Sequence, residues 1–390
     1  MLNDFPEHLK EALVMIIKKE GYETCSITKR TLSSKGANLL GILHEVDVIG
    51  TAANGCNKTN YLFIKQAMVL NKIRAVSIDN IYSKEVYFYT EVAQILDNLQ
   101  NEADIPERER FNIANGYDES SEKAIILENL TRKGYKTFNK AEGLTLKCAE
   151  LSIEQLAKFH ALCLVMQKRM PDYYEMKIKK QKCPVMFNDD WNGFLVNICG
   201  KFVDALEEDT KSKVGWLLSR MQNDYPSYLT EDSPVCVMCH GDYKPQNIMI
   251  KEVDGEVVDV MPLDYQLAYH GCPINDLMFY IFSGTDQQFR GRHLEHLKGL
   301  YHDCMGRFLG RFGVDVEAVF PRGQFERMYK ERLLFGLMVG TLMSYFAFVP
   351  EDDLPDVENS EMSEFVVNPE PGYESWVRGL VDDFTQWGCL

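Results

Sequence analysis

The residues of this sequence whose types and spacing suit chemistry lie between positions 240 and 276. Residues 240–247 read H-G-D-Y-K-P-Q-N, which places an Asn five positions after an Asp, and Asp264 follows at the end of the next apolar hairpin. Transfer of a phosphoryl group needs a carboxylate that orients the attacking hydroxyl, and oxygen ligands that hold magnesium against the phosphates. The spacing therefore predicts a phosphotransferase site in which Asp242 faces the substrate and Asn247 and Asp264 face one magnesium ion.

Neighbouring residues support this loop. Asp and Asn are also common turn residues, so each position alone indicates little. The ordered combination of strand, loop, apolar hairpin, Asp264 and a helix start at Asp276 is much more specific. We expect His240 to brace the loop, and Asp276 to cap its helix and bond the loop backbone. Lys244, two residues after Asp242, either assists transfer or merely lies on the loop.

The elements that must position these residues fall into two parts. The first part is β-rich, and its predicted elements are a helix over 1–19, strands over 41–49, 61–65 and 123–127, and a helix over 83–99. Asn54 and Gly55 supply the turn of an antiparallel hairpin. Glu85 falls in the first turn of its predicted helix, where it can form an ion pair across a cleft with Lys65 on the preceding strand.

The second part is mainly helical. Its predicted helices cover 152–170, 191–208, 210–224, 287–310, 322–348 and 373–387, and its predicted strands cover 235–240, 248–253 and 257–263. The change near Leu130 predicts an α+β fold with a nucleotide-binding lobe over 1–130 and a catalytic and acceptor-binding lobe over 131–390. The acidic stretch 350–372 is expected to be mobile, as a solvated connector rather than a functional lid.

The order of these motifs resembles the aminoglycoside and choline kinase relatives of protein kinases and, more closely, the ecdysteroid kinase-like family of arthropods. The resemblance runs nearly end to end, and its pieces are Y-L-F-I-K at 61–65, Y-S-K-E-V-Y-F-Y at 82–89, I-L-E-N-L at 126–130, L-A-K-F-H-A at 156–161, the loop at 240–247 and the terminal helix. It implies the two-lobed protein-kinase-like fold, with ATP and Mg2+ as cofactors.

Roles follow from the resemblance position by position. It implies that Asp242 is the catalytic base or hydroxyl-orienting residue and that Asn247 and Asp264 bind magnesium. Lys65 would contact the nucleotide phosphates and be held by Glu85.

The resemblance also implies that Glu128, Asn129 and Leu130 form the hinge beside the adenine. The alternative for Lys65 and Glu85 is a surface Lys and a solvated helix Glu.

The sequence departs from ordinary protein kinases in two ways. The motif G-x-G-x-x-G is absent, so a phosphate-covering loop between Gly36 and Gly41 would rely on small residues and backbone amides. The A-P-E segment is absent too, because a helix follows Asp264 almost at once, which removes the usual platform for a protein substrate.

Composition excludes several other classes. A formal net charge of -16 over 390 residues argues against a nucleic-acid or anionic-membrane binder, since such surfaces need clustered Lys and Arg. The uncharged stretch 333–349 is shorter than the roughly 20 residues of a membrane span, and we expect a buried helix there. No obligate protein partner is indicated.

The eleven cysteines are expected to be free thiols in a cytoplasmic protein. Cys236 and Cys239 form a C-x-x-C, but residues three apart on a strand face opposite sides, which favours core or rim thiols over a zinc site.

The leading hypothesis is therefore a kinase for a small organic alcohol, with ecdysteroids or xenobiotic alcohols suggested by the family resemblance alone. Its acceptor pocket is expected in the helical lobe, near Trp191 and the helix ending near Phe348. One alternative is a choline-like or aminoglycoside-like kinase, which would need an acidic and aromatic pocket for a cation. Another is a catalytically silent pseudokinase that acts as a binding module.

Overall fold

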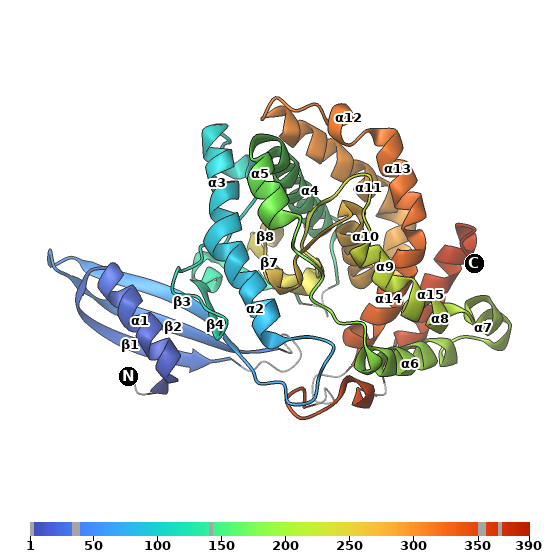
Figure 1. Ribbon diagram of the computed structural model, residues 1–390, viewed down its shortest axis with the longest axis horizontal. Helices are drawn as coiled ribbons and strands as arrows, with labels where there is room; N and C mark the ends of the chain where they lie inside the picture. Colours follow the sequence, from blue (N-terminus) through green and yellow to red (C-terminus); the bar gives the residue numbers. More distant parts are fainter. Residues whose placement is uncertain (1–3, 33–39, 140–142, 350–355, 366–368) are drawn as a thin grey trace.

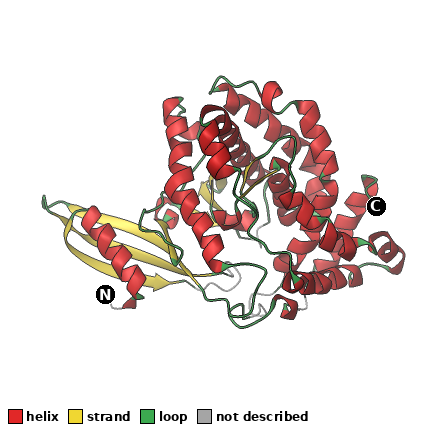
Figure 2. Cartoon of the chain, viewed as in Figure 1, coloured by secondary structure: helices red, strands yellow, loops and turns green. Residues whose placement is uncertain are grey.

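The computed structural model describes residues 4–32, 40–139, 143–349, 356–365 and 369–390. A β-sheet covered by the N-terminal helix projects from a larger, mainly helical body (Figure 1). Colouring by secondary structure shows the same separation, with only short strands inside the helical body (Figure 2). The predicted α+β, two-lobed arrangement is confirmed.

The small lobe is built on one antiparallel sheet. Up to the end of this sheet the elements are α1 (Glu7–Lys19), β1 (Tyr22–Thr31), β2 (Gly41–Ala52), β3 (Asn57–Ala67), α2 (Ile78–Tyr87), the π-helix η2 (Phe88–Val92), α3 (Ala93–Glu102), the short helix η3 (Glu107–Glu109) and β4 (Ala124–Glu128). The strand order is β1-β2-β3-β4. We propose that this lobe ends near Leu130, after β4.

The larger lobe holds the remaining elements. They are η4 (Leu130–Lys133), β5 (Tyr135–Thr137), α4 (Leu146–Arg169), α5 (Pro171–Tyr173), η6 (Tyr174–Ile178), α6 (Asp189–Asp204), α7 (Glu208–Val214), α8 (Leu217–Asn223), α9 (Tyr225–Thr230), β6 (Val237–Cys239), η7 (Pro245–Asn247), β7 (Ile248–Val253), β8 (Glu256–Pro262), η8 (Tyr265–Leu267), β9 (Tyr269–Gly271), α10 (Pro273–Gly284), α11 (Gln287–Gly310), α12 (Val316–Val319), α13 (Arg322–Glu331), α14 (Leu333–Phe348), η10 (Met362–Glu364) and α15 (Tyr373–Gln386).

Alternation along β3 separates the structural face of the sheet from its chemical face. Leu62 and Ile64 are fully buried in a cluster with Leu13 of α1. Lys65 points to the opposite face because successive side chains of a strand alternate, and it is paired in register with Ile125 of β4. The sheet therefore presents Lys65 to the cleft between the lobes.

Two short sheets bring the predicted catalytic segments together. β6 pairs with β9, and β7 pairs with β8 and β5. Because Ile248 is paired with Pro262, Asn247 lies beside Leu263, whose N–H donates to the Asn247 carbonyl at 2.9 Å. Asn247 and the adjacent Asp264 are thus neighbours in space.

Some predicted boundaries were wrong. The helix predicted over 83–99 begins earlier, at Ile78, where the Ser77 hydroxyl accepts from the N–H of Asn80 at 3.5 Å. Glu85 therefore lies late in α2 rather than in its first turn. The helix predicted over 210–224 is two helices, α7 and α8, which separate at Gly215. β1 was missed because it is a mostly exposed edge strand without an alternating apolar pattern.

The buried helix expected over 333–349 is present as α14. Its residues from Phe335 to Tyr345 are buried. Among the described residues no single helix is long and apolar enough to cross a membrane, although α13 and α14 together pass that test as a pair bent by 51°. All eleven cysteines are described, and each is a free thiol.

One buried ion pair ties α11 to the C-terminal helix α15. Arg290 Nε donates to Asp383 Oδ2 at 2.6 Å, and both side chains are at most 5% exposed. Breaking a buried pair from one side leaves an uncompensated charge, so we expect Asp383→Asn to lower the free energy of unfolding by about 3 kcal/mol. Chemical denaturation measures this loss.

The exposed neighbour Asp382 supplies the matched control. Asp382→Asn removes the same charge and should change stability by less than about 0.5 kcal/mol. Equal losses in the two variants would mean that the Arg290–Asp383 pair does not hold the helix.

Candidate active site

The predicted catalytic loop starts where β6 ends, on a turn that requires glycine. Gly241 has a φ of +82°, and a Cβ at this position would lie 2.2 Å from the backbone oxygen of Leu267. Only glycine avoids both the strained conformation and the clash. The turn brings Asp242 to the wall of a cavity between the lobes.

Asp276 holds this turn from behind. Its two carboxylate oxygens accept the backbone N–H of His240 at 2.6 Å and of Gly241 at 2.9 Å, and His160 Nε2 donates to it at 3.1 Å. Asp276 is 0% exposed. The predicted helix cap was wrong: α10 begins after Cys272 with a proline, and the Asp276 carboxylate is turned to the loop instead.

His240 is a fixed, neutral brace. Its Nε2 donates to the carbonyl of Leu263 at 2.9 Å, which leaves Nδ1 to accept the N–H of Asp242 at 3.3 Å. Burial lowers the pKa of His240, although the charges of nearby carboxylates oppose the shift. The ring therefore joins the loop to the segment just before Asp264.

Asp242, Lys244 and Asn247 meet at one carboxylate oxygen. Asp242 Oδ2 accepts Lys244 Nζ at 2.8 Å and Asn247 Nδ2 at 2.9 Å. No described donor is bonded to Asp242 Oδ1. Asn247 Nδ2 donates both to Asp242 Oδ2 and to the Asp242 carbonyl, which fixes the orientation of the amide and leaves its oxygen available to a ligand. The loop thus presents one carboxylate oxygen and one amide oxygen.

Asp264 occupies a conformation that few non-glycine residues adopt. Its φ and ψ are 70° and 62°, in the left-handed region. Such a residue costs about 1–2 kcal/mol and persists only where its surroundings hold it. Lys65 Nζ donates to Asp264 Oδ1 at 2.6 Å. The strained turn therefore places the carboxylate opposite the small lobe.

Lys65 and Glu85 form the ion pair that their spacing predicted. The Nζ of Lys65 lies 2.8 Å from Glu85 Oε2 and also donates to Gln266 Oε1 at 3.0 Å. Burial would lower the pKa of Lys65, but the charges of Asp264 and Glu85 outweigh it and raise that pKa. Burial raises the pKa of Glu85 to about 7, despite the opposing charge of Lys65.

An aromatic column connects these parts. The Phe88 and Tyr265 rings are stacked with centroids 3.4 Å apart, and the Tyr265 and His240 centroids lie 4.5 Å apart. Phe88 follows α2, and Tyr265 follows Asp264. A shift of α2 would therefore be transmitted to both predicted catalytic turns.

The predicted hinge residues lie at the junction of the lobes, but their side chains are engaged locally. Glu128 forms an ion pair with Lys133, the Asn129 side chain accepts the N–H of Thr131 at 3.1 Å, and Leu130 is buried. Contact with adenine stays a proposal for their backbone.

Most of the predicted phosphate-covering loop lies outside the described residues, since only its end at Leu40 and Gly41 is described. The carbonyl of Leu40 accepts the Tyr82 hydroxyl at 3.1 Å. A Cβ on Gly41 would lie 2.7 Å from that hydroxyl oxygen, so glycine allows α2 to reach the loop end.

One cavity of about 260 Å³ joins the predicted catalytic residues to an apolar chamber. Asp242, Lys244, Asn247 and Asp264 line one side. The chamber beyond them is lined by Ile73, Ala75, Val76, Cys183, Val185, Trp191, Phe194, Tyr225, Leu229, Phe279, Leu342, Met343, Phe346, Val357, Met362 and Phe365, among others. Trp191 and α14 contribute to it as predicted.

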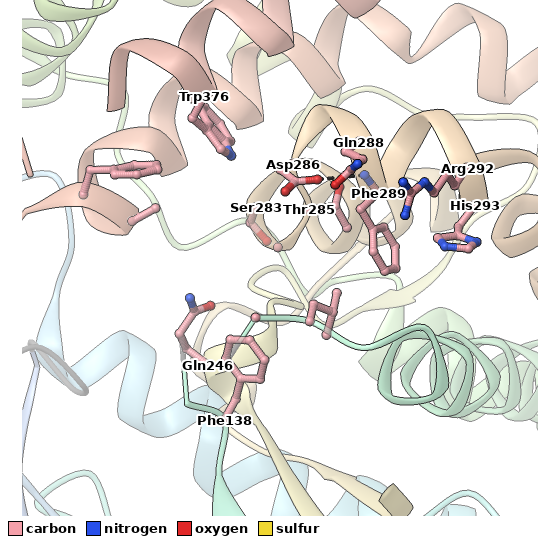
Figure 3. Close-up of a pocket in the computed structure, with 15 residues that line it drawn as sticks. Phe138, Gln246, Ser283, Thr285, Asp286, Gln288, Phe289, Arg292, His293 and Trp376 are labelled. Atoms are coloured by element: carbon pink, nitrogen blue, oxygen red, sulfur yellow. Dashed lines mark hydrogen bonds between the residues drawn. The ribbon is translucent and has the colours of Figure 1, made fainter. Parts of the chain in front are cut away.

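A second cavity adjoins the first. Gln246, Ser283 and Ala347 line both. Figure 3 shows Gln246 and Phe138 across this second space from Ser283, which lies at the end of α10. The two compartments therefore meet beside the catalytic loop.

Several residues of the site escaped sequence reasoning. Gln266 was passed over because its contact with Lys65 spans the lobes, and His160 was read only as part of a family motif. Tyr225 lines the chamber, with its ring centroid 5.8 Å from that of Trp191. No local pattern marks such a residue, because its role comes from packing between α6 and α9.

The site contains the Lys65–Glu85 pair, the Asp242 carboxylate with the Asn247 amide, and the strained Asp264 turn. These features are the arrangement that phosphoryl transfer on a protein-kinase-like fold requires. A family model described as the ecdysteroid kinase-like family matches residues 35–314, and the chain belongs to this family.

Similar solved structures include a GDP complex of an aminoglycoside 2'-phosphotransferase-IIIa mutant, with 11% identity, a TM-score of 0.37 and coverage of 97% of both chains. Another is a glucosamine kinase in complex with glucosamine, ADP and inorganic phosphate, with 12% identity, a TM-score of 0.37 and coverage of 93% of this chain and 82% of the other. No curated protein matches the chain.

A second lysine of α2, Lys84, is buried against the larger lobe. Its Nζ donates to Gln181 Oε1 at 3.1 Å and to the carbonyl of Ala268 at 3.2 Å, so both partners are neutral. Burial lowers the pKa of Lys84 to about 8. Lys84 therefore fastens α2 beside the Asp264 turn through uncharged contacts.

This burial predicts a pH dependence. The unfolded chain, with a lysine pKa near 10.4, binds more protons than the folded protein above pH 8, so unfolding becomes harder as pH rises through this window. We compare the free energies of unfolding of the wild type and of Lys84→Met, which lacks the titrating group. Between about pH 8 and pH 10 the wild-type value should rise by about 2 kcal/mol relative to that of the variant. Denaturant titrations at each pH measure the difference.

Exposed Lys72 provides the control, because Lys72→Met should leave the pH slope of the wild type unchanged. If the difference in free energy of unfolding between the wild type and Lys84→Met stayed constant with pH, the lowered pKa of Lys84 would be contradicted.

Proposed function

We propose that this protein transfers the γ-phosphate of ATP, held with Mg2+, to a hydroxyl of an uncharged, mainly apolar small molecule. One observation carries the proposal: Asp242 lines the cavity that opens into the apolar chamber, and its Oδ1 is bonded to no described donor. A hydroxyl of a molecule in that chamber would find its hydrogen-bond acceptor at this oxygen.

The donor set fits a magnesium ion. Magnesium prefers oxygen ligands and is usually held by one or two carboxylates together with substrate phosphates and waters. Asp264 and the amide oxygen of Asn247 supply such ligands on the same cavity wall. Among the described residues no group of three or more His, Cys, Asp or Glu side chains is arranged for a metal, so the set is small. When bound, the ion would neutralise phosphate charge.

The residues divide the reaction between them. Lys65, fixed by Glu85, would hold the nucleotide phosphates. Asp242 would orient the acceptor hydroxyl and accept its proton as the new oxygen–phosphorus bond forms and the bond from the γ-phosphorus to the bridging oxygen of ADP breaks. Lys244 lies 2.8 Å from Asp242 and could turn to the transferred group.

The chamber favours a neutral acceptor. The charged side chains among its described lining residues are Asp242, Lys244 and Asp264, all of which belong to the transfer machinery. A polycationic aminoglycoside would need further carboxylates. Tyr225 adds a polar group, and burial raises the pKa of its phenol, with the charges of Cys183 and Asp242 adding to the shift. An ecdysteroid or a xenobiotic alcohol fits these properties.

A panel of acceptors tests this choice. With Mg2+ and ATP, we expect neutral steroid or other apolar alcohols to give phosphorylated product at least about 10-fold more efficiently than choline, an aminoglycoside or a serine peptide, since unpaired charges are poorly tolerated in an apolar pocket. Mass spectrometry of the products measures the ratio. Preference for choline or an aminoglycoside would replace the proposed acceptor class, and nucleotide binding without any transfer would indicate a pseudokinase.

Two conservative variants separate the acidic roles. Asp264→Asn removes a charged metal ligand, so it should weaken magnesium-dependent ATP binding as well as turnover. Asp242→Asn should keep ATP affinity while turnover falls by about 10²-fold or more, the scale for losing a positioned base. Calorimetry and turnover with the best acceptor measure both.

Asp232→Asn, at an exposed position, is the control and should behave as wild type. The division of roles fails if Asp242→Asn loses ATP affinity as severely as Asp264→Asn, or if it keeps wild-type turnover.

A further inference from the structure

Two segments that do not belong to the long helices of the larger lobe cover one side of the proposed acceptor chamber. One is the connection between β3 and α2, which contributes Ile73, Ala75 and Val76. The other is the stretch 356–365, which contributes Val357, Met362 and Phe365. The solvated connector predicted over 350–372 was wrong for the stretch 356–365, because Val357 and Phe365 are buried. The parts of that prediction over 350–355 and 366–368 lie outside the described residues. We call these two segments the roof.

A single carboxylate ties both roof segments to α6. Asp190 Oδ2 accepts the backbone N–H groups of Arg74 at 2.7 Å and Ala75 at 3.2 Å. Asp190 Oδ1 accepts the N–H of Met362 at 3.0 Å. Asp190 is 6% exposed and lies in the first turn of α6, where the helix dipole favours a negative charge.

Other contacts bring the same surfaces together. The N–H of Asn71 donates to the Glu358 carbonyl at 3.0 Å, which joins the two segments directly. Asn197 Nδ2 donates to the Ser363 carbonyl at 2.5 Å. A Cβ on Gly193 would lie 3.0 Å from Ser363 Cβ, so glycine allows this close approach. The roof is therefore fitted to α6, with Asp190 joining all three parts.

We propose that Asp190 is a positioning residue that keeps the roof closed over the acceptor and so sets which alcohols bind. The proposal rests on the proposed function of the same cavity. Asp190 does not line the cavity and would touch neither the acceptor nor the phosphates. Its influence passes through Ala75 and Met362, which do line it, and it should therefore act on acceptor affinity rather than on nucleotide binding.

Two readouts test the proposal. In Asp190→Ala, hydrogen exchange of peptides covering 70–76 and 356–365 should accelerate about 10-fold or more, because the amides of Arg74 and Met362 lose their acceptors. Asp190→Asn keeps one accepting oxygen and should show a smaller acceleration. The KM for the best apolar alcohol should rise about 10-fold, while the Kd for magnesium-ATP stays within about 2-fold of wild type. The exchange experiment needs no acceptor.

Exposed Asp189 provides a matched control one residue away. Asp189→Asn removes the same charge from the same helix turn and should change neither readout.

Two results would overturn the positioning role. One is faster hydrogen exchange in the roof with an unchanged KM for the acceptor, and the other is unchanged hydrogen exchange. Parallel losses of ATP affinity and thermal stability would instead make Asp190 a general fold residue. If no alcohol is phosphorylated by the wild type, the proposed function fails on its own, while exchange still decides whether Asp190 holds the roof.

Discussion

The buried ammonium of Lys65 is the contact on which the rest of the site depends. It meets Glu85 of α2, Asp264 and Gln266, all within 3.0 Å, and it is 4% exposed. A buried charge is tolerated only when it is paired and hydrogen-bonded. β3, α2 and the turn after β8 must therefore converge at one point, and the strained conformation of Asp264 is sustained by that convergence. The column of Phe88, Tyr265 and His240 carries the same constraint to the catalytic loop.

One cavity has the polar residues of the proposed transfer site on one side and a mainly apolar wall on the other. The transfer residues are held by short turns whose backbone groups are bonded by Asp276 and His240, whereas the chamber is built from the sides of helices and from the roof. These walls have different physical bases: directional hydrogen bonds fix the first, and packing of aromatic and aliphatic side chains fixes the second. Substitutions that change the shape of the chamber can therefore leave the geometry of the loop unchanged.

The sequence allowed the proposed transfer residues to be predicted because phosphoryl transfer requires particular residue types at short spacing. Asp242, Asn247 and Asp264 lie on two adjacent turns, and Lys65 and Glu85 lie on consecutive elements, β3 and α2. The chamber could be located only roughly, near Trp191 and α14, because its walls come from helices far apart in sequence. Asp190 carried no signal, since an acidic residue at a helix start is ordinarily solvated. The stretch 356–365 was misread for the same reason, as its acidic composition hid Val357 and Phe365.

The connection from β3 to α2 adjoins the sheet of the small lobe, yet it lines the chamber that we propose for the acceptor. Any rotation of the small lobe toward a nucleotide would consequently alter the space left for the alcohol. Thermodynamic linkage makes such an influence mutual, so that each substrate would change the affinity of the other by the same factor. The two substrates would then bind cooperatively or antagonistically, according to whether the rotation improves or impairs the fit of the chamber around the alcohol.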